Sequence, residues 1–235
     1  MRDFRVVNSF KLADGIFELA LAPADQVPLF AFTPGQFVML HLLNADGSVW
    51  AKSAYSISSA PADSSETIKL AIKIRGEFTQ RAQQLKAGDA VKVQGPFGKF
   101  ILPKQASHLV MLAGGIGIAP FRSMIRAALD AQPACQVTLF YSCKTLESMA
   151  YYDELMRLGA YHPEFKPVCS LTGYAPQDWT GETGRIGAQL FQKHVSEPAN
   201  ATFLVCGSRE FVQDMADMLK KSGVDIEHNL FKEMF

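Results

Sequence analysis

The sequence predicts a two-domain protein in which an antiparallel β-barrel precedes an α/β domain built on a parallel sheet. Residues 1–102 contain short strand-like runs separated by glycine and proline, which is typical of antiparallel barrels. After Pro103, apolar strands alternate with helical patterns, as in right-handed βαβ units. The length of 235 residues fits two small domains or one large one.

The first part of the chain is predicted to consist mainly of strands. In residues 67–74, isoleucine and leucine alternate with lysine and alanine, which is the period of a half-buried strand. One short helix is predicted at Thr79–Lys86, with Thr79 as its N-cap. The other predicted strands are Phe4–Phe10, Ile16–Ala22, Gln36–Leu42, Ser53–Ser58 and Ala90–Gly95.

A change of pattern near residues 102–106 divides the chain into predicted domains 1–103 and 104–235. Continuous apolar runs in the second domain predict strands that are covered on both faces. These strands are His108–Ala113, Val137–Tyr141, Phe165–Cys169 and Ala201–Cys206. The predicted helices are Pro120–Ala131, Ser148–Leu158, Gly187–His194 and Glu210–Ser222.

Composition excludes several classes of protein. Lys+Arg and Asp+Glu are both 23, so the basic excess of a nucleic-acid-binding protein is absent. The four cysteines form no CxxC pair, which argues against a zinc ribbon or an iron–sulfur cluster. The longest apolar stretch, residues 109–121, is too short to span a membrane, and the first residues lack a signal-peptide pattern. We therefore expect a cytoplasmic protein with reduced thiols.

Gly114-Gly115-Ile116-Gly117 is the best candidate for a phosphate-binding loop, because it lies between a predicted strand and a predicted helix. Glycine has no Cβ, so a phosphate can approach the backbone, and a helix N-terminus offers unpaired N–H groups. Pro120 fits the first helical position, where its missing N–H costs nothing. The third glycine of the GxGxxG fingerprint is absent, so a plain strand–helix turn is the alternative. The βαβ context favours the phosphate site.

Other segments have a structural and a functional interpretation. Tyr55 and Ser56 fit an ordinary strand. The basic residues before Gly76 precede a predicted helix start, where a second phosphate can bind, although an ordinary capped helix explains them too. Gly95–Gly98 is a turn signal.

Near the end of the chain, Cys206 and Gly207 follow a predicted strand. This is the edge where open α/β sheets bind ligands, but a buried cysteine is usually only a small hydrophobe. The tail Lys232-Glu233-Met234-Phe235 has no role by default, because chain ends are commonly frayed.

Taken together and in this order, these segments resemble the ferredoxin–NADP⁺ reductase superfamily, here without a fused iron–sulfur domain. The resemblance covers essentially the whole chain. It implies a flavin-binding barrel followed by a nicotinamide-nucleotide-binding α/β domain, with FAD favoured over FMN and with NADPH or NADH as the hydride donor. Residues 53–56 lie where the family has Arg-x-Tyr-Ser, Cys206-Gly207 matches its Cys-Gly, and the tail matches its terminal Glu-x-aromatic.

The resemblance implies a role for each matched residue. Tyr55 packs on the flavin ring, and Ser56 makes a hydrogen bond near the reactive flavin nitrogen. Phe235 shields the flavin face until the nicotinamide arrives, and Cys206 and Glu233 shape the nicotinamide pocket. The implied catalytic residues are thus Ser56, Cys206, Glu233 and Phe235. The implied flavin-binding residues are Ser53, Ala54, Tyr55, Ser56, Ala71, Ile72, Lys73, Gly76, Phe78 and Thr79. The implied coenzyme-binding residues are Gly114, Gly115, Gly117, Ile118, Ala119, Pro120, Ser142, Lys144, Cys206, Gly207 and Phe235.

Two positions bear on ligand choice. Ser53 replaces the arginine that pairs with a flavin phosphate in the family, and Lys52 and Lys73 are nearby cations; weak flavin binding, with flavin as a substrate, is the minority hypothesis. Ser142 and Lys144 follow the second strand of the α/β domain. A cation at that position favours the 2′-phosphate of NADPH, whereas a solvated surface lysine is the alternative.

The predicted function is hydride transfer from NAD(P)H to FAD, with electrons passed to a separate acceptor. Such transfer requires the two rings at about 3–3.5 Å. The expected acceptor is a ferredoxin, a flavodoxin, an oxygenase component or a small molecule such as free flavin; nucleic acid and membrane partners are not expected. The alternative is a flavin- and nucleotide-binding regulatory or electron-transfer subunit of a larger complex, without turnover of its own.

Overall fold

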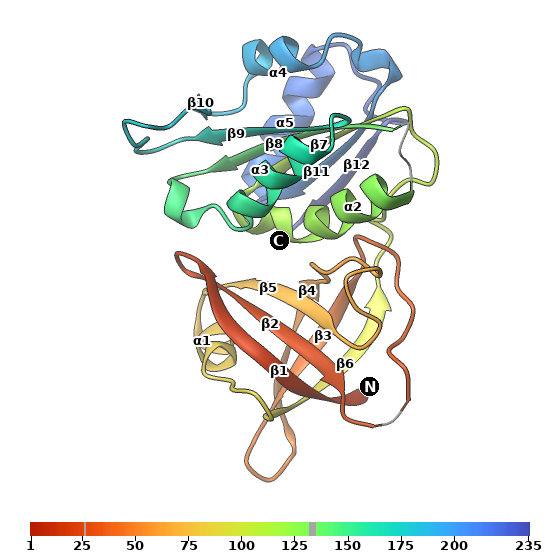
Figure 1. The fold of residues 1–235 in the computed structure, drawn as a ribbon, viewed down its shortest axis with the longest axis vertical. Helices are drawn as coiled ribbons and strands as arrows, with labels where there is room; N and C mark the ends of the chain where they lie inside the picture. Colours follow the sequence, from red (N-terminus) through yellow and green to blue (C-terminus); the bar gives the residue numbers. More distant parts are fainter. Residues whose placement is uncertain (26, 132–134) are drawn as a thin grey trace. The chain divides into compact units, whose positions relative to one another are not determined.

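The structure is a computed structural model that describes residues 1–25, 27–131 and 135–235. The chain forms two compact units: unit 1 is Met1–Leu102 with Ala119–Ala127, and unit 2 is Pro103–Ile118 with Ala128–Phe235. Unit 1 contains a six-stranded antiparallel sheet and unit 2 a six-stranded parallel sheet (Figure 1). The predicted fold class is confirmed.

The sheet of unit 1 has the strand order β4-β3-β6-β1-β2-β5. An isolated bridge between Ile57 and Leu70 joins the two ends of this order and closes the sheet into a barrel. One short helix, α1 (Glu77–Gln83), follows β5. The strands are β1 (Arg2–Ala13), β2 (Ile16–Pro23), β3 (Phe37–Leu43), β4 (Val49–Ser56), β5 (Ile68–Lys73) and β6 (Ala90–Phe97).

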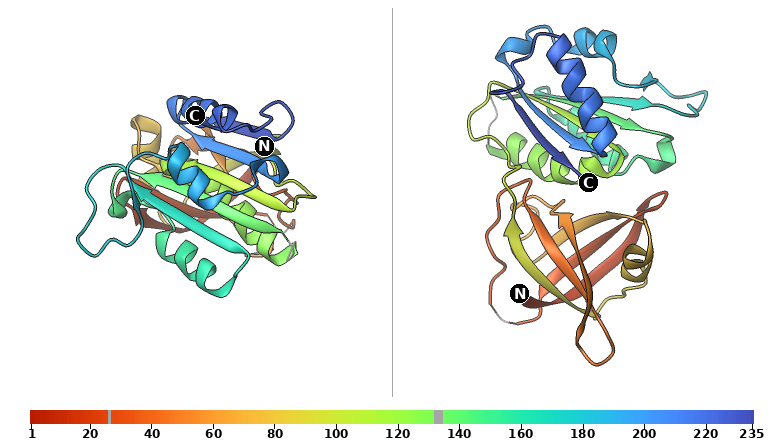
Figure 2. Two further views of the ribbon diagram at one scale, coloured as in Figure 1. Left: turned by 90° about the horizontal axis from the view of Figure 1, so that it is seen from above. Right: turned by 180° about the vertical axis from the view of Figure 1, so that it is seen from behind.

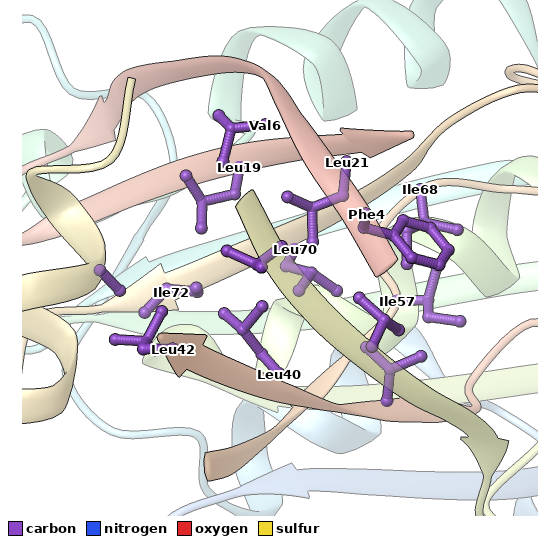
Figure 3. Close-up of a cluster of buried hydrophobic side chains, with 14 of the residues drawn as sticks. Phe4, Val6, Leu19, Leu21, Leu40, Leu42, Ile57, Ile68, Leu70 and Ile72 are labelled. Carbon is purple, nitrogen blue, oxygen red and sulfur yellow. The ribbon is translucent and has the colours of Figure 1, made fainter. Parts of the chain in front are cut away.

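The apolar side chains of the alternating pattern predicted for residues 67–74 lie in the barrel core. Ile68, Leu70 and Ile72 are fully buried, and Figure 3 shows their side chains pointing towards those of the neighbouring strands. The core is mainly aliphatic, with the aromatic rings of Phe4 and Phe17, and its β-branched and aromatic side chains suit a pleated, half-buried surface. Other members of the cluster are Phe4, Val6, Leu19, Leu21, Leu40, Leu42, Ile57, Val91 and Val93.

The sheet of unit 2 has the strand order β10-β9-β8-β7-β11-β12, with parallel neighbours throughout. Its strands are β7 (His108–Gly114), β8 (Gln136–Cys143), β9 (Phe165–Leu171), β10 (Glu182–Thr183), β11 (Thr202–Gly207) and β12 (Leu230–Met234). Its α-helices are α3 (Tyr152–Tyr161), α4 (Ala188–His194) and α5 (Arg209–Lys221), and its short 3₁₀ helices are η1 (Gly115–Gly117), η2 (Leu146–Ser148) and η3 (Pro198–Asn200). Helix α2 (Ile118–Ala131) is divided between the units, with residues 119–127 in unit 1.

The two faces of the parallel sheet are covered by different helices. Apolar residues of α4 and α5, such as Phe191 and Met215, pack on strand residues such as Val110 and Phe203, while α3 lies on the opposite face (Figure 1). Among the described residues, no helix combines the length and apolar character that a membrane span requires.

Three local predictions are wrong: the first residue of α1, its N-cap, and the position of Pro120 in α2. Helix α1 begins at Glu77, and its N-cap is Gly76 at φ 80° rather than Thr79; glycine adopts this left-handed conformation without strain. Pro120 is the third residue of α2, not the first, because η1 leads directly into the helix.

The chain end is also more ordered than a frayed tail. Residues 230–234 form β12, which pairs in parallel with β11 and appears as the darkest blue strand at the edge of the sheet in Figure 2. This pairing brings a segment that is remote in the sequence to the sheet edge where β11 ends.

Candidate functional site

The glycine loop after β7 is shaped by a close approach to β11. A Cβ on Gly117 would lie 2.2 Å from the carbonyl oxygen of Cys206, so only glycine fits there. Gly115 differs, because its φ is +52° and a Cβ would meet nothing within 4 Å. The sequence therefore supplies one glycine that packing requires and one whose backbone faces open space.

The glycine loop after β7 and the end of β11 lie where the strand order of the sheet reverses. From β7 the chain proceeds to β8 and β9 on one side of the sheet, and β11 and β12 lie on the other side. Ligands of open α/β sheets bind outside the carboxyl ends of the strands at such a switch point. Gly114 ends β7 and Gly207 ends β11, so the structure gathers these predicted residues at one edge.

Phe211 of α5 covers the two strand ends. A Cβ on Gly114 would lie 2.7 Å from the Phe211 ring, and one on Gly207 would lie 2.8 Å from it. The hydroxyl of Ser208 caps α5 by accepting a hydrogen bond from the Phe211 backbone N–H at 3.3 Å. The sequence pattern gave no signal for this aromatic contact, because the contact depends on how α5 leaves β11.

Cys206 and the chain end meet at the same edge. Cys206 is opposite Glu233 in the β11–β12 ladder, and the backbone N–H of Phe235 donates to the carbonyl of Gly207 at 3.3 Å. Cys206 is fully buried. Burial, and secondarily the charge of Glu233, raise the pKa of the Cys206 thiol well above its usual value. The thiol is therefore neutral, so it is a small, weakly polar packing group and not a nucleophile.

Ser142 and Lys144 belong to this edge too. Ser142 is opposite Gly114 in the β7–β8 ladder, and Lys144 follows β8 with its side chain exposed. The N–H of Gly173, after β9, donates to the Lys144 carbonyl at 2.9 Å. The exposed Lys144 side chain thus follows the strand next to the glycine loop, where it can meet an anionic group.

In unit 1, an aromatic row joins β4 to α1. The rings of Tyr55 and Phe78 are stacked with centroids 6.0 Å apart, and Phe78 and Trp50 are stacked at 6.1 Å. The Arg81 guanidinium lies 4.5 Å from the Trp50 ring centroid. Burial raises the pKa of the Tyr55 phenol, and a hydrogen bond with Ser53 opposes this only in part, so Tyr55 is a neutral, partly buried ring.

The turn before α1 is held by Thr79. Its hydroxyl accepts a hydrogen bond from the Arg75 N–H at 2.6 Å and donates to the Gly76 carbonyl at 3.0 Å. A Cβ on Gly76 would meet nothing within 4 Å. The backbone at Gly76 is thus accessible, and the two hydrogen bonds of the Thr79 hydroxyl fix the conformation of this turn.

The remaining predicted flavin residues lie on β4 and β5. Ala71, Ile72 and Lys73 are on β5, which pairs with β2 and is bridged to Ile57 through Leu70. Ser53 and Ala54 precede Tyr55 on β4, where Ser53 is opposite Leu40 and Lys52 is opposite His41. Successive side chains of a strand point to opposite faces, so Lys52 points away from the face of Ser53 and Tyr55.

A buried ion pair was missed by the sequence reasoning. Arg122 of α2 donates to Asp63 with 2.6 Å between Nη1 and Oδ2, and the two residues are 59 positions apart in the chain. The available signal was a charged residue inside an apolar helical pattern after Pro120, but the sequence does not reveal its partner.

Comparison with known proteins gives two family matches. Residues 9–101 match the family of oxidoreductase FAD-binding domains, and residues 111–217 match that of oxidoreductase NAD-binding domains. The reductase subunit of glycine betaine monooxygenase from Chromohalobacter salexigens is 29% identical over 213 residues, with 87% of this chain and 56% of that one covered. The chain therefore spans little more than half the length of this relative.

Solved structures share the fold. The FAD/NAD-binding domain of nitric oxide dioxygenase from Vibrio cholerae superposes with a TM-score of 0.89 at 20% identity, covering 100% of this chain and 98% of that one. A ferredoxin–NADP⁺ reductase from Neisseria gonorrhoeae with bound FAD and NADP gives 0.81 at 22% identity, covering 99% and 97%. At these identities the likeness establishes the fold alone.

The two kinds of glycine in the loop predict two kinds of defect. Gly117→Ala forces a methyl against the Cys206 carbonyl and is expected to lower the free energy of unfolding by about 1–3 kcal/mol or more. Gly115→Ala costs about 1–2 kcal/mol of backbone strain but leaves the packing intact, and it is expected to weaken NAD(P)H binding about tenfold, or 1.4 kcal/mol. Denaturant unfolding and coenzyme titration measure both effects. Equal stability of Gly117→Ala and wild type contradicts the close approach.

Proposed function

Because the chain belongs to the ferredoxin–NADP⁺ reductase superfamily, with an FAD-binding domain ahead of an NAD-binding domain, we propose that it moves a hydride from NADPH or NADH to FAD and passes the electrons to a separate acceptor. The observation that carries this proposal is the convergence of the glycine loop, Cys206-Gly207, Ser142 and the chain end at one switch point. We assign the flavin to residues 1–103 and the nicotinamide coenzyme to residues 104–235.

The residues of unit 1 fit a flavin. Tyr55 offers a neutral ring on β4, and the backbone groups of Ala71–Lys73 on β5 are proposed to meet the flavin edge. Gly76 provides a backbone position that no side chain covers, suited to the diphosphate of FAD. The hydroxyl of Ser53 replaces an arginine fork with a neutral group, and Lys73 on β5 is a cation proposed to approach the flavin phosphates.

The residues of unit 2 fit a dinucleotide. Gly115 exposes backbone at the N-terminal end of the helical segment that continues as α2, where phosphates are favoured by the unpaired N–H groups. Ile118, Ala119 and Pro120 form the first turn of α2 with buried side chains, so these residues are proposed to contribute backbone rather than side chains to the site. The exposed ammonium of Lys144 supports NADPH over NADH, because a cation favours the 2′-phosphate.

Bound FAD would supply the chemistry that no side chain has, since it accepts two electrons as a hydride and releases them singly. The protein's own groups bind and orient. Cys206, buried and neutral, would give the nicotinamide an uncharged contact, and Glu233, opposite it on β12, is proposed to shape the same pocket. Ser56 would donate or accept a hydrogen bond at the flavin edge, and Phe235 is proposed to shield the flavin until the coenzyme arrives. A general base is not required.

The acceptor is proposed to be a protein or a small molecule that does not belong to this chain. The name of the Chromohalobacter salexigens relative, a monooxygenase reductase subunit, supports an oxygenase component, with a ferredoxin, a flavodoxin or free flavin as further candidates. The four cysteines are free thiols, which supports a cytoplasmic location because that compartment keeps thiols reduced.

Reduction of the flavin tests the proposal. The purified protein, supplied with FAD and freed of oxygen, is mixed with NADPH or NADH while flavin absorbance is recorded. We expect bleaching by at least one coenzyme, faster with NADPH, followed by recovery when an acceptor is added. FAD and coenzyme that bind without bleaching would favour the alternative of a regulatory or electron-transfer subunit, and failure to bind FAD would reject both.

The chain end gives a second prediction. Removal of Phe235, which is 56% exposed, is expected to change NAD(P)H affinity and the preference between NADPH and NADH, while FAD stays bound. Phe231→Ala is the matched control, because Phe231 is a phenylalanine on β12, four residues before Phe235, and is 41% exposed. Titration of flavin reduction against coenzyme concentration measures both variants. An unchanged affinity and preference after removal of Phe235 would show that the tail has no such role.

A further inference from the structure

A buried polar cluster joins α2 to the segment that follows β4. Arg122 donates from Nη1 to the Ser58 carbonyl at 2.9 Å and to Asp63 at 2.6 Å. Ser123 donates to the Ser59 carbonyl at 2.7 Å. Arg122 and Ser123 are 7% and 0% exposed, and all of these residues belong to unit 1. The proposed reaction does not by itself explain this cluster.

The carboxylate of Asp63 is ionised in this setting. Burial raises the pKa of Asp63. The hydrogen bond and charge of Arg122, with smaller contributions from the Ala60 N–H and Arg126, lower it by more, so the pKa of Asp63 lies below its usual value. The Ala60 N–H donates to Oδ2 at 2.9 Å, and Arg126 Nε lies 3.4 Å from Oδ1. Asp63 is thus a charged acceptor held between its own loop and the helix.

The same segment is fixed to β5. The Ser58 hydroxyl donates to the Lys69 carbonyl at 3.0 Å, and the Lys69 N–H donates to the Ser59 hydroxyl at 3.0 Å. β4 ends at Ser56, directly before this segment. Residues 57–63 therefore tie together β4, β5 and α2, which are the two strands assigned to the flavin and the helix that follows the coenzyme loop.

Apolar contacts already hold α2 in unit 1. The rings of Phe121 and Phe100 have centroids 5.8 Å apart, and a Cβ on Gly35 would lie 2.3 Å from Cε of Met124. A buried ion pair adds little net stability compared with an apolar replacement, so the polar cluster is not needed for burial. Its directional hydrogen bonds instead fix the helix in one register, because sliding the helix would leave the Ser58 and Ser59 carbonyls without these donors.

We propose that Asp63, Arg122 and Ser123 are positioning residues that lock the start of α2 to the segment between the flavin-contacting strands, so that coenzyme on the preceding glycine loop is held in register for hydride transfer. The proposal rests on the proposed function for its catalytic part. Arg122 lies on the helix that continues from Gly117, so any displacement of this helix moves the loop to which it is joined.

The test compares three proteins. Asp63→Leu with Arg122→Met removes both charges together, which avoids the large destabilisation that follows when one buried partner is left alone. Ser123→Ala is a milder variant that removes a single hydrogen bond. Asp3→Leu with Lys92→Met is the matched control, because it removes an ion pair from the same unit whose Asp3 side chain is 66% exposed.

The first measurement is amide hydrogen exchange on the ligand-free proteins. We expect faster exchange in residues 57–63 and 119–127 of the Asp63/Arg122 variant, a smaller change for Ser123→Ala, and none for the control. The second is flavin reduction at saturating coenzyme, expected to slow about tenfold to hundredfold in the Asp63/Arg122 variant, with FAD affinity within about twofold of wild type. The long-wavelength absorbance of stacked nicotinamide and flavin rings is expected to weaken in parallel.

Unchanged exchange in both segments overturns the proposal, as does a reduction rate in the Asp63/Arg122 variant within twofold of the control. Slower reduction with unchanged exchange also overturns it, because the defect would then not arise from a released helix. If the wild type is not reduced by either coenzyme, the proposed function fails, and hydrogen exchange alone decides whether the lock exists.

Discussion

The contact between Gly117 and the carbonyl of Cys206 is the constraint on which unit 2 depends. It brings the loop after β7 against the end of β11, and it is possible only because residue 117 has no Cβ. The reversal of strand order places this contact at the carboxyl edge of the sheet, and Phe211 covers the adjoining glycines. The edge keeps one accessible stretch of backbone at Gly115, beside a neutral, buried thiol.

The two units expose backbone next to uncharged side chains in different ways. In unit 1, a closed barrel supplies a rigid wall, and the ring row Tyr55–Phe78–Trp50 extends from that wall onto α1. In unit 2, parallel strands bring loops from distant parts of the chain to one edge. Both arrangements place uncharged surfaces next to exposed backbone, a combination that suits ligands with flat rings and phosphates. Charged residues adjoin both surfaces: Arg81 lies over the Trp50 ring in unit 1, and Lys144 follows β8 in unit 2.

Much of this fold could be predicted from the sequence because its signals are local. The alternation in residues 67–74 predicted β5, and the apolar runs predicted β7 and β11, since burial on both faces leaves a continuous pattern. The glycines of residues 114–117 predicted the loop. Local patterns also misplaced the start of α1: threonine is a good N-cap in general, but a left-handed Gly76 made that role unnecessary.

The parts that could not be predicted depend on pairs of distant residues. Residues 230–234 carry too little periodicity to predict a strand. They form β12 because they pair with β11. Arg122 was visible as a charge in an apolar helix, but its partner Asp63 lies in another part of the chain. Phe211 covers Gly114 and Gly207 for a geometric reason that no spacing encodes. Such contacts form after topology is set, so sequence patterns cannot specify them.

The most direct measurement of the central claim is an NMR titration of the isotopically labelled protein with oxidised coenzyme. If the edge formed by β7 and β11 holds the coenzyme, the amide signals of Gly115 and of residues 206–208 will shift together and saturate at one concentration. Saturable binding that leaves these amides unmoved, while shifting signals elsewhere in the chain, would contradict the account.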